Sequence, residues 1–179
     1  KAENWELEDT LQPKAAHILL GGQWTGSFDV LSGNSIPTSF TADGAYPFFT
    51  CSQEPIKAPS YSFDTNAVIL AGNGDFNVKL YRGKFEAYQR TYVLSPDDEK
   101  YLYLLYNSVH ESMAVLVKGA SGSTIKFLTK GMIESIPLFV PTDELLAQYN
   151  DYSEAVQRKL ECLKSAIKNC LMQKVIRCI

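Results

Sequence analysis

Apolar runs typical of β-strands occupy the middle of the chain. Residues 46–50 are rich in aromatic side chains, and residues 67–71 form a short continuous apolar run that suits a buried strand. Residues 77–81 alternate between apolar and polar side chains, the pattern of a strand with one covered face. Because Gly and Asn tolerate positive φ angles, residues 72–75 are expected to form a turn. This part of the chain therefore predicts a β-rich domain.

A longer alternating strand is expected over residues 84–94, after a tight connection at residues 82–83. Along such a strand, neighbouring side chains point to opposite faces of the sheet. Gln89 and Arg90 would then be separated, and we do not expect both of them to contact the same ligand.

A buried helix is predicted after these strands. Ser95 suits the N-cap and Pro96 the first helical position, while the acidic residues 97–99 complement the positive end of the helix dipole. Residues 101–106 are apolar on all sides, which indicates a helix enclosed by the rest of the domain. The small side chains of residues 118–124 then predict a loop.

The last segment predicts one long helix. Thr142 can serve as its cap, acidic residues 143–144 occupy its first turn, and no helix-breaking residue follows before Ile179. About 36 residues of helix would be about 54 Å long, longer than a small domain is wide. Apolar side chains three or four positions apart form one stripe along it: Leu145, Tyr149, Tyr152, Val156, Leu160, Leu163, Ile167 and Leu171. Such a stripe cannot be buried along its full length against one small domain, so the helix requires a partner helix.

These patterns predict an α+β chain in which a β-rich domain over residues 1–141 is followed by one long coiled-coil helix over residues 142–179. Hydrophobic residues make up 45% and charged residues 21% of the chain, as in ordinary globular proteins. No apolar run approaches the roughly 20 residues required to span a bilayer, so no membrane partner is expected.

The cysteines and the N-terminus indicate a cytoplasmic chain. Cys162, Cys170 and Cys178 are eight residues apart on the predicted helix, and each such step rises about 12 Å. Disulfide bonds require Cα atoms within about 7 Å, so free thiols in a reducing cytosol are expected, with a metal or redox role as the alternative. The first residues lack the pattern of a signal peptide and an initiating Met, and we expect a chain processed or cut from a longer one.

No constellation of catalytic residues is evident in the sequence. There is no phosphate-binding loop, no dinucleotide fingerprint and no nucleophile elbow, and His17 and His110 are the only histidines. Residues 96–100 superficially resemble the acidic–lysine set of restriction nucleases, but they crowd into one expected helical turn. We therefore expect neither enzymatic activity nor a cofactor or catalytic metal.

The charge distribution gives a modest signal for a polyanionic partner. The net charge is −3, although nucleic-acid binders usually carry a basic patch. Residues 79–90 nevertheless contain four basic side chains and only one acidic side chain.

Several motifs, in order, resemble the target recognition domains of type I restriction–modification specificity subunits. They are YPFFTCS (residues 46–52), AVILAGNG (67–74), YRGKF (81–85), QRTYVL (89–94), YLYLL (101–105), GSTIKFL (122–128) and IPL (136–138). The resemblance covers roughly residues 27–179, and the long helix is similar to the spacer helix of that family. Residues 138–141 depart slightly from the family's more proline-rich exit.

The resemblance implies a non-catalytic subunit that reads half of a split sequence in double-stranded DNA. It implies methyltransferase subunits as partners, with the restriction subunit as a further candidate. The helix would act as a ruler between half-sites, pairing with the helix of a second recognition domain or of an identical chain. Whether the chain is a natural half-subunit or a fragment of a two-domain subunit stays open.

Candidate DNA contacts follow from side-chain chemistry. Basic groups neutralise phosphates, while Gln and Arg can make paired hydrogen bonds to base edges. Backbone amides and hydroxyl groups of a small-residue loop can also approach a phosphate. The candidates are Ser52, Asn73, Lys79, Arg82, Lys84, Gln89, Arg90, Ser121, Ser123, Thr124 and Lys126.

Two other functions are compatible with the residues. The acidic net charge and the ten Tyr residues would also suit a coiled-coil assembly module whose β-rich domain binds protein or carbohydrate. A hydrolase with an unrecognised site is the third alternative. Salt-sensitive binding to duplex DNA distinguishes the first reading from both.

Overall fold

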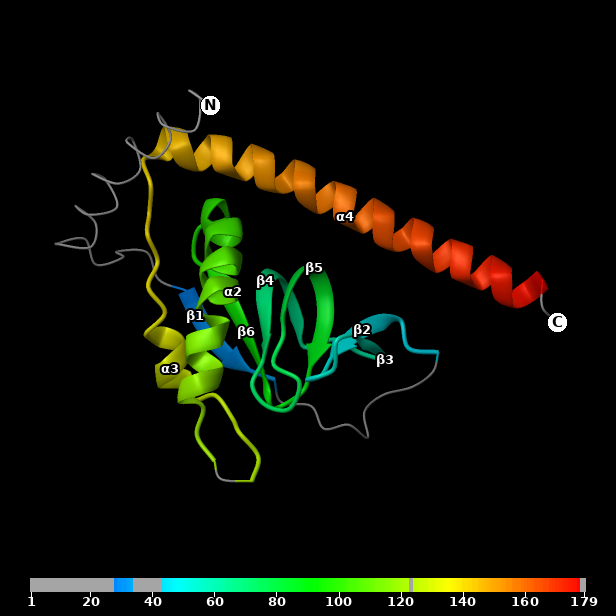
Figure 1. The fold of residues 1–179 in the computed structure, drawn as a ribbon, viewed down its shortest axis with the longest axis horizontal. Helices are drawn as coiled ribbons and strands as arrows, with labels where there is room; N and C mark the ends of the chain where they lie inside the picture. Colours follow the sequence, from blue (N-terminus) through cyan, green and yellow to red (C-terminus); the bar gives the residue numbers. More distant parts are fainter. Residues whose placement is uncertain (1–27, 34–42, 123, 178–179) are drawn as a thin grey trace. The chain divides into compact units, whose positions relative to one another are not determined.

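The structure is a computed structural model that describes residues 28–33, 43–122 and 124–177, with side chains described up to Cys170. The chain divides into two compact units, and the division falls between Val140 and Pro141. Within the described residues, the first unit contains the sheet, two α-helices and a short 3-10 helix, and the second contains one long helix (Figure 1).

Six strands form the sheet within the described residues. They are β1 (Phe28–Ser32), β2 (Tyr46–Phe49), β3 (Ile56–Ala58), β4 (Phe63–Ala71), β5 (Val78–Ala87) and β6 (Thr91–Pro96). Their order across the sheet is β1-β6-β4-β5-β2-β3. All neighbouring strands are antiparallel except β2 and β5, which are parallel.

The sheet curls so that the end of β5 meets the start of β6. These strands flank β4 on opposite sides, yet residues 88–90 alone connect them. The backbone N–H of Tyr88 donates to the carbonyl of Phe49 on β2 at 2.9 Å, and the N–H of Thr91 donates to the carbonyl of Tyr88 at 2.8 Å. The turn between β5 and β6 is therefore held against the end of β2.

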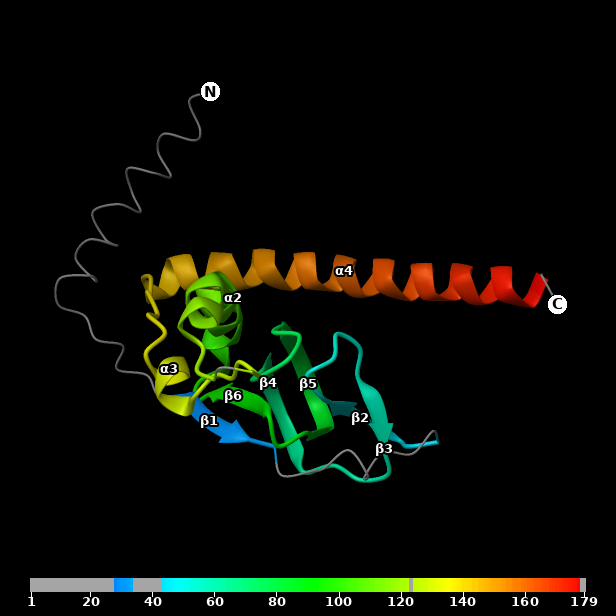
Figure 2. The ribbon, with the colours of Figure 1, turned by 60° about the horizontal axis from the view of Figure 1, so that its bottom comes forward.

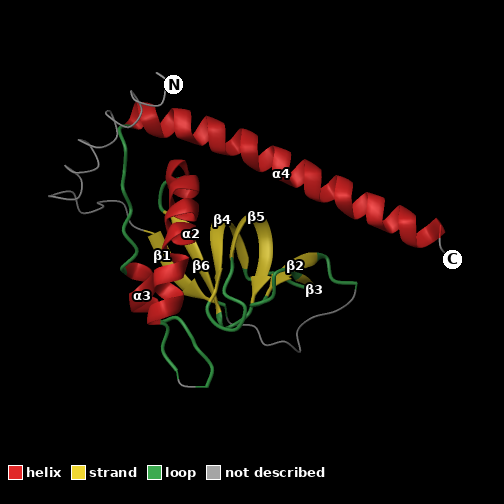
Figure 3. Ribbon diagram, viewed as in Figure 1, coloured by secondary structure: helices red, strands yellow, loops and turns green. Residues whose placement is uncertain are grey.

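Both faces of β4 are covered, which explains its continuous apolar sequence. Val68 and Leu70 belong to a core with residues of α2 (Leu102–Gly119) and α3 (Lys130–Glu134). Figures 2 and 3 show α2 on this side of the sheet. Ala67 and Ile69 point to the opposite face, into a second core with Phe49, Phe85, Ala87 and Val93. A strand that alternates between two cores has no polar face.

The expected strand over residues 84–94 was wrong, because residues 88–90 form a turn between β5 and β6. The expected connection at residues 82–83 was also wrong, since β5 continues through Gly83 and pairs there with Thr65. Gly83 has a φ of 109°, which glycine accommodates without leaving the ladder. The turn at residues 88–90 contains neither Gly nor Pro. No turn-forming residue therefore interrupts the alternation of apolar and polar residues, which is why a continuous strand was predicted.

The predicted start of the helix was also wrong. β6 extends through Ser95 to Pro96, and Ser95 shares a hydrogen bond of 3.0 Å with Thr65 on β4. Asp98 caps a short 3-10 helix, η2 (Glu99–Tyr101), which leads directly into α2. Pro96 is tolerated at the strand end because no ladder hydrogen bond is needed beyond it. The expected burial of the helix is confirmed on one face only: Leu102, Tyr103, Leu105 and Val109 are buried, whereas Leu104 and Tyr106 are half-buried and Val115 is exposed.

Replacing Asp98 with alanine should lower the free energy of unfolding by about 1 kcal/mol, the usual effect of losing an N-cap. The side chain of Asp98 accepts a hydrogen bond of 3.0 Å from the backbone N–H of Lys100, and alanine leaves that donor unpaired. Urea unfolding of Asp98→Ala measures the loss. Asp98→Asn retains the acceptor and should stay within a few tenths of a kcal/mol of the wild type. An equal loss in both variants would contradict the capping role.

The second unit consists of α4 (Asp143–Arg177), in agreement with the long terminal helix expected from the apolar stripe. The exposed fractions of Tyr152, Leu163 and Ile167 on this stripe are 72%, 58% and 59%, and Val156 and Leu160 are exposed as well. Tyr149 is half-buried, and the side chain of Leu171 lies outside the described part. None of the helices described is long and apolar enough to cross a membrane.

Candidate nucleic-acid interface

Three connections meet at one end of the curled sheet. They are residues 50–54 after β2, residues 72–77 between β4 and β5, and residues 88–90 between β5 and β6. The backbone N–H of Gly72 donates to the carbonyl of Arg90 at 2.8 Å, which joins the second connection to the third. The contact between Tyr88 and the end of β2 joins the third to the first.

A fourth segment, residues 120–128 between α2 and α3, lies against the same place. Phe127 forms isolated β-bridges with both Asn73 and Ser121, and the N–H of Leu128 donates to the carbonyl of Gly72 at 2.8 Å. Figure 1 shows this loop and the β4–β5 turn at the lower end of the sheet. We call the four segments together the loop end.

A half-buried polar network connects the first two segments of the loop end. The thiol of Cys51 donates to Oδ1 of Asn73 at 2.8 Å. Nδ2 of Asn77 donates to the carbonyl of Cys51 at 3.0 Å. The ammonium group of Lys79 donates to the carbonyl of Ser52 at 2.8 Å and also to Oδ1 of Asn77. These contacts fix the backbone after β2 against the turn after β4.

Lys79 is a basic group whose charge is partly withdrawn from water. Burial lowers the pKa of Lys79 from its usual value, although the nearby carboxylates of Asp75 and Glu54 favour its charged form. A half-buried cation held in this way is a poor candidate for a phosphate contact, because two of its three donors already face oxygen atoms of the protein.

An open hollow of about 430 Å³ lies at the loop end. It is lined by Thr50, Cys51, Ser52, Gln53, Asp75 and Tyr88. Gln53 bridges its two sides by donating from Nε2 to the carboxylate of Asp75 at 2.9 Å. Its lining therefore offers amide, hydroxyl and carboxylate groups, as a surface that reads hydrogen-bonding edges requires.

Gln89 and Arg90 are exposed beside this hollow, at the tip of the β5–β6 turn. Their backbone carbonyls hold the turn in place, since that of Gln89 accepts from Oγ of Ser32 at 2.7 Å and that of Arg90 accepts from Gly72. The guanidinium of Arg90 makes no hydrogen bond or ion pair with the part of the chain that the structure describes. Because both residues lie in a turn, strand alternation does not separate them.

The loop between α2 and α3 contributes three exposed candidates to the loop end, Ser121, Thr124 and Lys126. Gly122 adopts a φ of 104°, and a Cβ there would lie 2.2 Å from the carbonyl oxygen of Ile125. Glycine is thus required for this tight loop. Ser123, the fourth candidate of this loop, lies outside the described residues.

Arg82 and Lys84 are not part of the loop end. They occupy even-numbered positions of β5, so they lie opposite Asn66 and Asp64 of β4, whereas Lys79 lies on the other face. Nη2 of Arg82 donates to the hydroxyl of Tyr103 at 3.2 Å, and its guanidinium carbon is 5.3 Å from the centroid of that ring.

Lys84 is held by two neighbours of opposite or partial negative charge. Its ammonium nitrogen is 3.9 Å from Oδ2 of Asp64 and 4.7 Å from the ring centroid of Tyr61. The hydrogen bond to Tyr61 and the charge of Asp64 raise the pKa of Lys84. Lys84 therefore lies beside an acidic and an aromatic side chain, in an ion pair that stays exposed to water.

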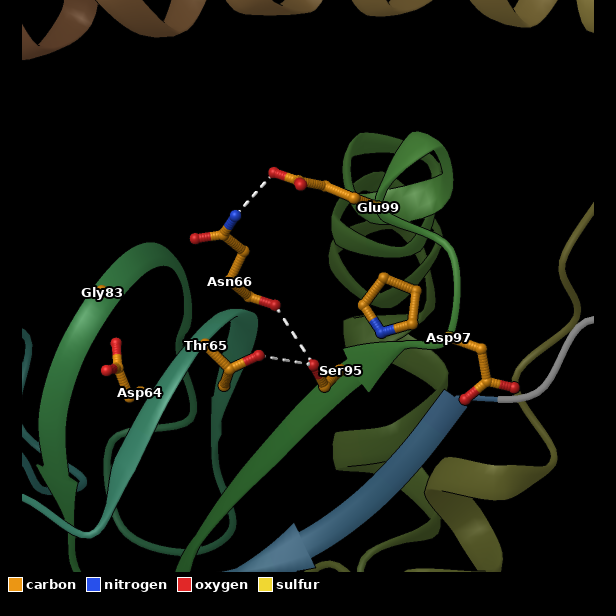
Figure 4. Close-up of a pocket in the computed structure, with 8 residues that line it drawn as sticks. Asp64, Thr65, Asn66, Gly83, Ser95, Asp97 and Glu99 are labelled. Atoms are coloured by element: carbon orange, nitrogen blue, oxygen red, sulfur yellow. Dashed lines mark hydrogen bonds between the residues drawn. The ribbon is translucent and has the colours of Figure 1, made fainter.

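A second hollow, of about 360 Å³, lies beside Arg82 and Lys84 and is acidic (Figure 4). It is lined by Asp64, Thr65, Asn66, Gly83, Ser95, Pro96, Asp97 and Glu99. Glu99 accepts a hydrogen bond of 2.5 Å from Nδ2 of Asn66. Three carboxylates repel phosphate groups, so this surface is unsuited to a DNA backbone. Among the residues described, no His, Cys, Asp and Glu side chains form a group that could hold a metal ion.

Sequence reasoning overlooked Cys51, Gln53, Asn77 and Tyr88. All four lie within two positions of residues that were selected, namely Ser52, Lys79 and Gln89. Their roles depend on partners far along the chain, as the separation of 26 positions between Cys51 and Asn77 illustrates. The only local signal was the cluster of polar residues on both sides of the Gly-Asn-Gly turn.

Comparison with known families identifies the family of this chain. Residues 27–161 match the family described as "Type I restriction modification DNA specificity domain". The chain belongs to this family. The match covers the described β-rich domain and about the first half of α4, and it confirms the resemblance found in the sequence.

One relative is the type I restriction enzyme EcoDI specificity subunit of Escherichia coli. It is 39% identical over 137 residues, which represent 70% of this chain and 30% of the relative. The chain thus spans about a third of the length of this specificity subunit.

Solved structures of the same family share the fold. The S subunit of a type I restriction–modification system from M. genitalium has a TM-score of 0.66 at 20% identity, covering 80% of this chain and 41% of that one. The HsdS subunit from Thermoanaerobacter tengcongensis has a TM-score of 0.57 at 16% identity, covering 90% and 46%. The α+β fold with a long terminal helix is therefore that of specificity subunits, of which this chain spans less than half.

Proposed function

We propose that this chain is the sequence-reading half of a type I specificity subunit, and that its loop end contacts double-stranded DNA. The observation that carries the proposal is the convergence of four chain segments, joined by hydrogen bonds, on one end of the sheet of a specificity-family domain. Exposed Gln89, Arg90, Ser121, Thr124 and Lys126 lie on these segments. The acidic hollow beside Arg82 and Lys84 faces away from the DNA in this proposal.

The chemistry of the loop end suggests a division of contacts. Arg90 and Lys126 are exposed cations that suit phosphates, and an Arg can instead make two hydrogen bonds to a guanine edge. Gln89 suits an adenine edge, and Ser52 and Asn73 offer short polar groups near the hollow. Arg82 and Lys84 contact side chains of the domain itself, and we propose no DNA contact for either.

Any chemistry on DNA belongs to the partner subunits in this proposal. The chain would position methyltransferase subunits, and the restriction subunit with them, in the cytoplasm where genomic DNA is available. Residues 1–141 would form the recognition domain and residues 142–179 the spacer helix. The apolar stripe of α4 would pair with the helix of a second recognition domain, supplied by the remainder of a longer chain or by an identical copy.

The test is salt-dependent binding of the full chain, together with its methyltransferase partner, to a pool of random duplexes. Each phosphate contact should contribute about −0.9 to the slope of log K against log salt concentration, so binding should fall steeply between low and physiological salt. Repeated selection from the pool should enrich one half-site sequence. Salt-insensitive binding, or no enrichment, would contradict the proposal. Either result would favour the alternative function, an assembly module that binds protein or carbohydrate.

A further inference from the structure

Lys79 and Asn77 connect two chain segments that are far apart in sequence. Asn77 is only 8% exposed, and its Nδ2 donates both to the carbonyl of Cys51 and to that of Asp75, at 3.0 and 2.5 Å. Its own backbone carbonyl accepts from the N–H of Ala71 at 2.9 Å, at the end of β4. One side chain therefore satisfies backbone groups of both the loop after β2 and the β4–β5 turn.

The ammonium group of Lys79 completes this arrangement from β5. It donates to the carbonyl of Ser52 at 2.8 Å and to the remaining oxygen of the Asn77 amide. With Oδ1 used by Lys79 and Nδ2 used by two carbonyls, both ends of the Asn77 amide are engaged. Lys79 thereby fixes which way the amide points, and it holds Ser52 through the same group.

We propose that Lys79 and Asn77 form a polar clamp that sets the position of residues 51–53 at the loop end and so determines which DNA sequence is read. Lys79 is then a positioning residue for recognition, not a phosphate contact. The proposal rests on the proposed function for its DNA readout, while the clamp itself can be measured without DNA.

The clamp is expected to affect DNA sequence specificity because the residues that it holds lie at the proposed DNA surface. Residues 51–53 line the hollow beside exposed Gln89 and Arg90, and Gln53 reaches Asp75 across it. A loop held in its binding conformation loses less conformational entropy when it contacts a base edge. A loop released from the clamp still presents the same groups, but it samples wrong positions as readily as the right one.

Phosphate contacts and positioning residues differ in their salt dependence. A lost phosphate contact weakens binding to all sequences alike and reduces the salt slope by about 1. A lost positioning residue leaves the slope unchanged and weakens binding to the cognate sequence only. Lys79→Met keeps the apolar stem and removes the donors, so it separates these two cases.

For Lys79→Met we expect about a 10-fold loss of affinity for the cognate duplex, as when one charged hydrogen bond is lost. Affinity for non-cognate duplexes and the salt slope should remain unchanged. The matched control is Lys126→Met, which alters an exposed lysine of the same loop end. It should weaken cognate and non-cognate binding equally and flatten the slope by about 1.

Backbone NMR relaxation of the free protein tests the clamp independently of DNA. Lys79→Met should lower the order parameters of residues 51–53 while leaving those of β4 and α2 as in the wild type. Unchanged order parameters, or a Lys79→Met variant that behaves as Lys126→Met does in the binding assay, would overturn the proposal. If the order parameters fall but no variant binds DNA in a salt-sensitive way, the clamp stands and the proposed function fails.

Discussion

Replacing Arg90 with alanine should weaken binding to the cognate duplex by about 10- to 100-fold, the range expected when a charged or paired contact to DNA is lost. The side chain is exposed at the tip of the β5–β6 turn, and its backbone is anchored to Gly72 at 2.8 Å. Alanine therefore removes a positioned guanidinium without disturbing the turn that carries it. Titration of labelled duplex against the chain with its methyltransferase partner measures the loss.

Lys84 provides the matched control, because sequence reasoning placed it in the same basic stretch. Its ammonium group is engaged by Asp64 and Tyr61 next to an acidic hollow, so Lys84→Ala should change DNA affinity by less than about 2-fold, as for a solvent-exposed ion pair remote from the ligand. Equal losses for Arg90→Ala and Lys84→Ala would mean that a diffuse positive charge, and not the loop end, attracts DNA. A base contact by Arg90 would in addition relax the sequence preference at a single position.

The double substitution Leu163→Asp and Ile167→Asp should abolish self-association through α4. These side chains are 58% and 59% exposed on one stripe, and each contributes about 1.5–3 kcal/mol when fully buried against a partner helix. Four such side chains in a symmetric pair amount to about 6–12 kcal/mol, so their loss should convert dimers to monomers at any practical concentration. Light scattering coupled to size-exclusion chromatography gives the mass directly.

The control for this experiment adds the same charge to the other side of α4. Ser165 and Asn169 lie about 180° around the helix from the stripe, since each residue advances about 100°. Ser165→Asp with Asn169→Asp should leave the dimer intact, and both double variants should keep the helical content of the wild type. If the unmodified chain is already monomeric, the stripe serves a second recognition domain of a longer chain and not an identical copy.

Local patterns in the sequence were sufficient for the elements whose environment is uniform. The run at residues 67–71 is apolar at every position because β4 lies between two cores, and no other element type suits so short a buried run. α4 was predictable to within a few residues, because a stripe with helical spacing continues for its whole length without a helix breaker. The family was also recognisable, since the order of its motifs follows the chain.

Local patterns predicted the wrong element boundaries where one pattern runs across two neighbouring elements. Alternation through residues 84–94 continues across a turn that contains no Gly or Pro, so β5 and β6 were joined in error. Ser95 and Pro96 have the composition of a helix start, but pairing with β1 extends β6 over both of them, and the hydroxyl of Ser95 shares a hydrogen bond with Thr65 on β4. Pairing of Asp29 with Ser95 and of Phe28 with Pro96, between strands far apart in sequence, outweighs the cap that these residues could have formed.

The sequence by itself determined a specificity-family domain with a long helix. The order of the motifs along the chain indicates the family, and the spacing of the apolar residues predicts the helix. What the tertiary structure decided is which polar residues act together. Lys79 and Lys84 belong to one basic stretch of the sequence, yet Lys79 lies at the start of β5 by the loop end, whereas Lys84 lies five residues further along, on the other face, beside an acidic hollow. Arg90 joins the first surface because the sheet curls and brings it to Gly72. Such groupings arise from contacts between distant segments, which only the folded chain contains.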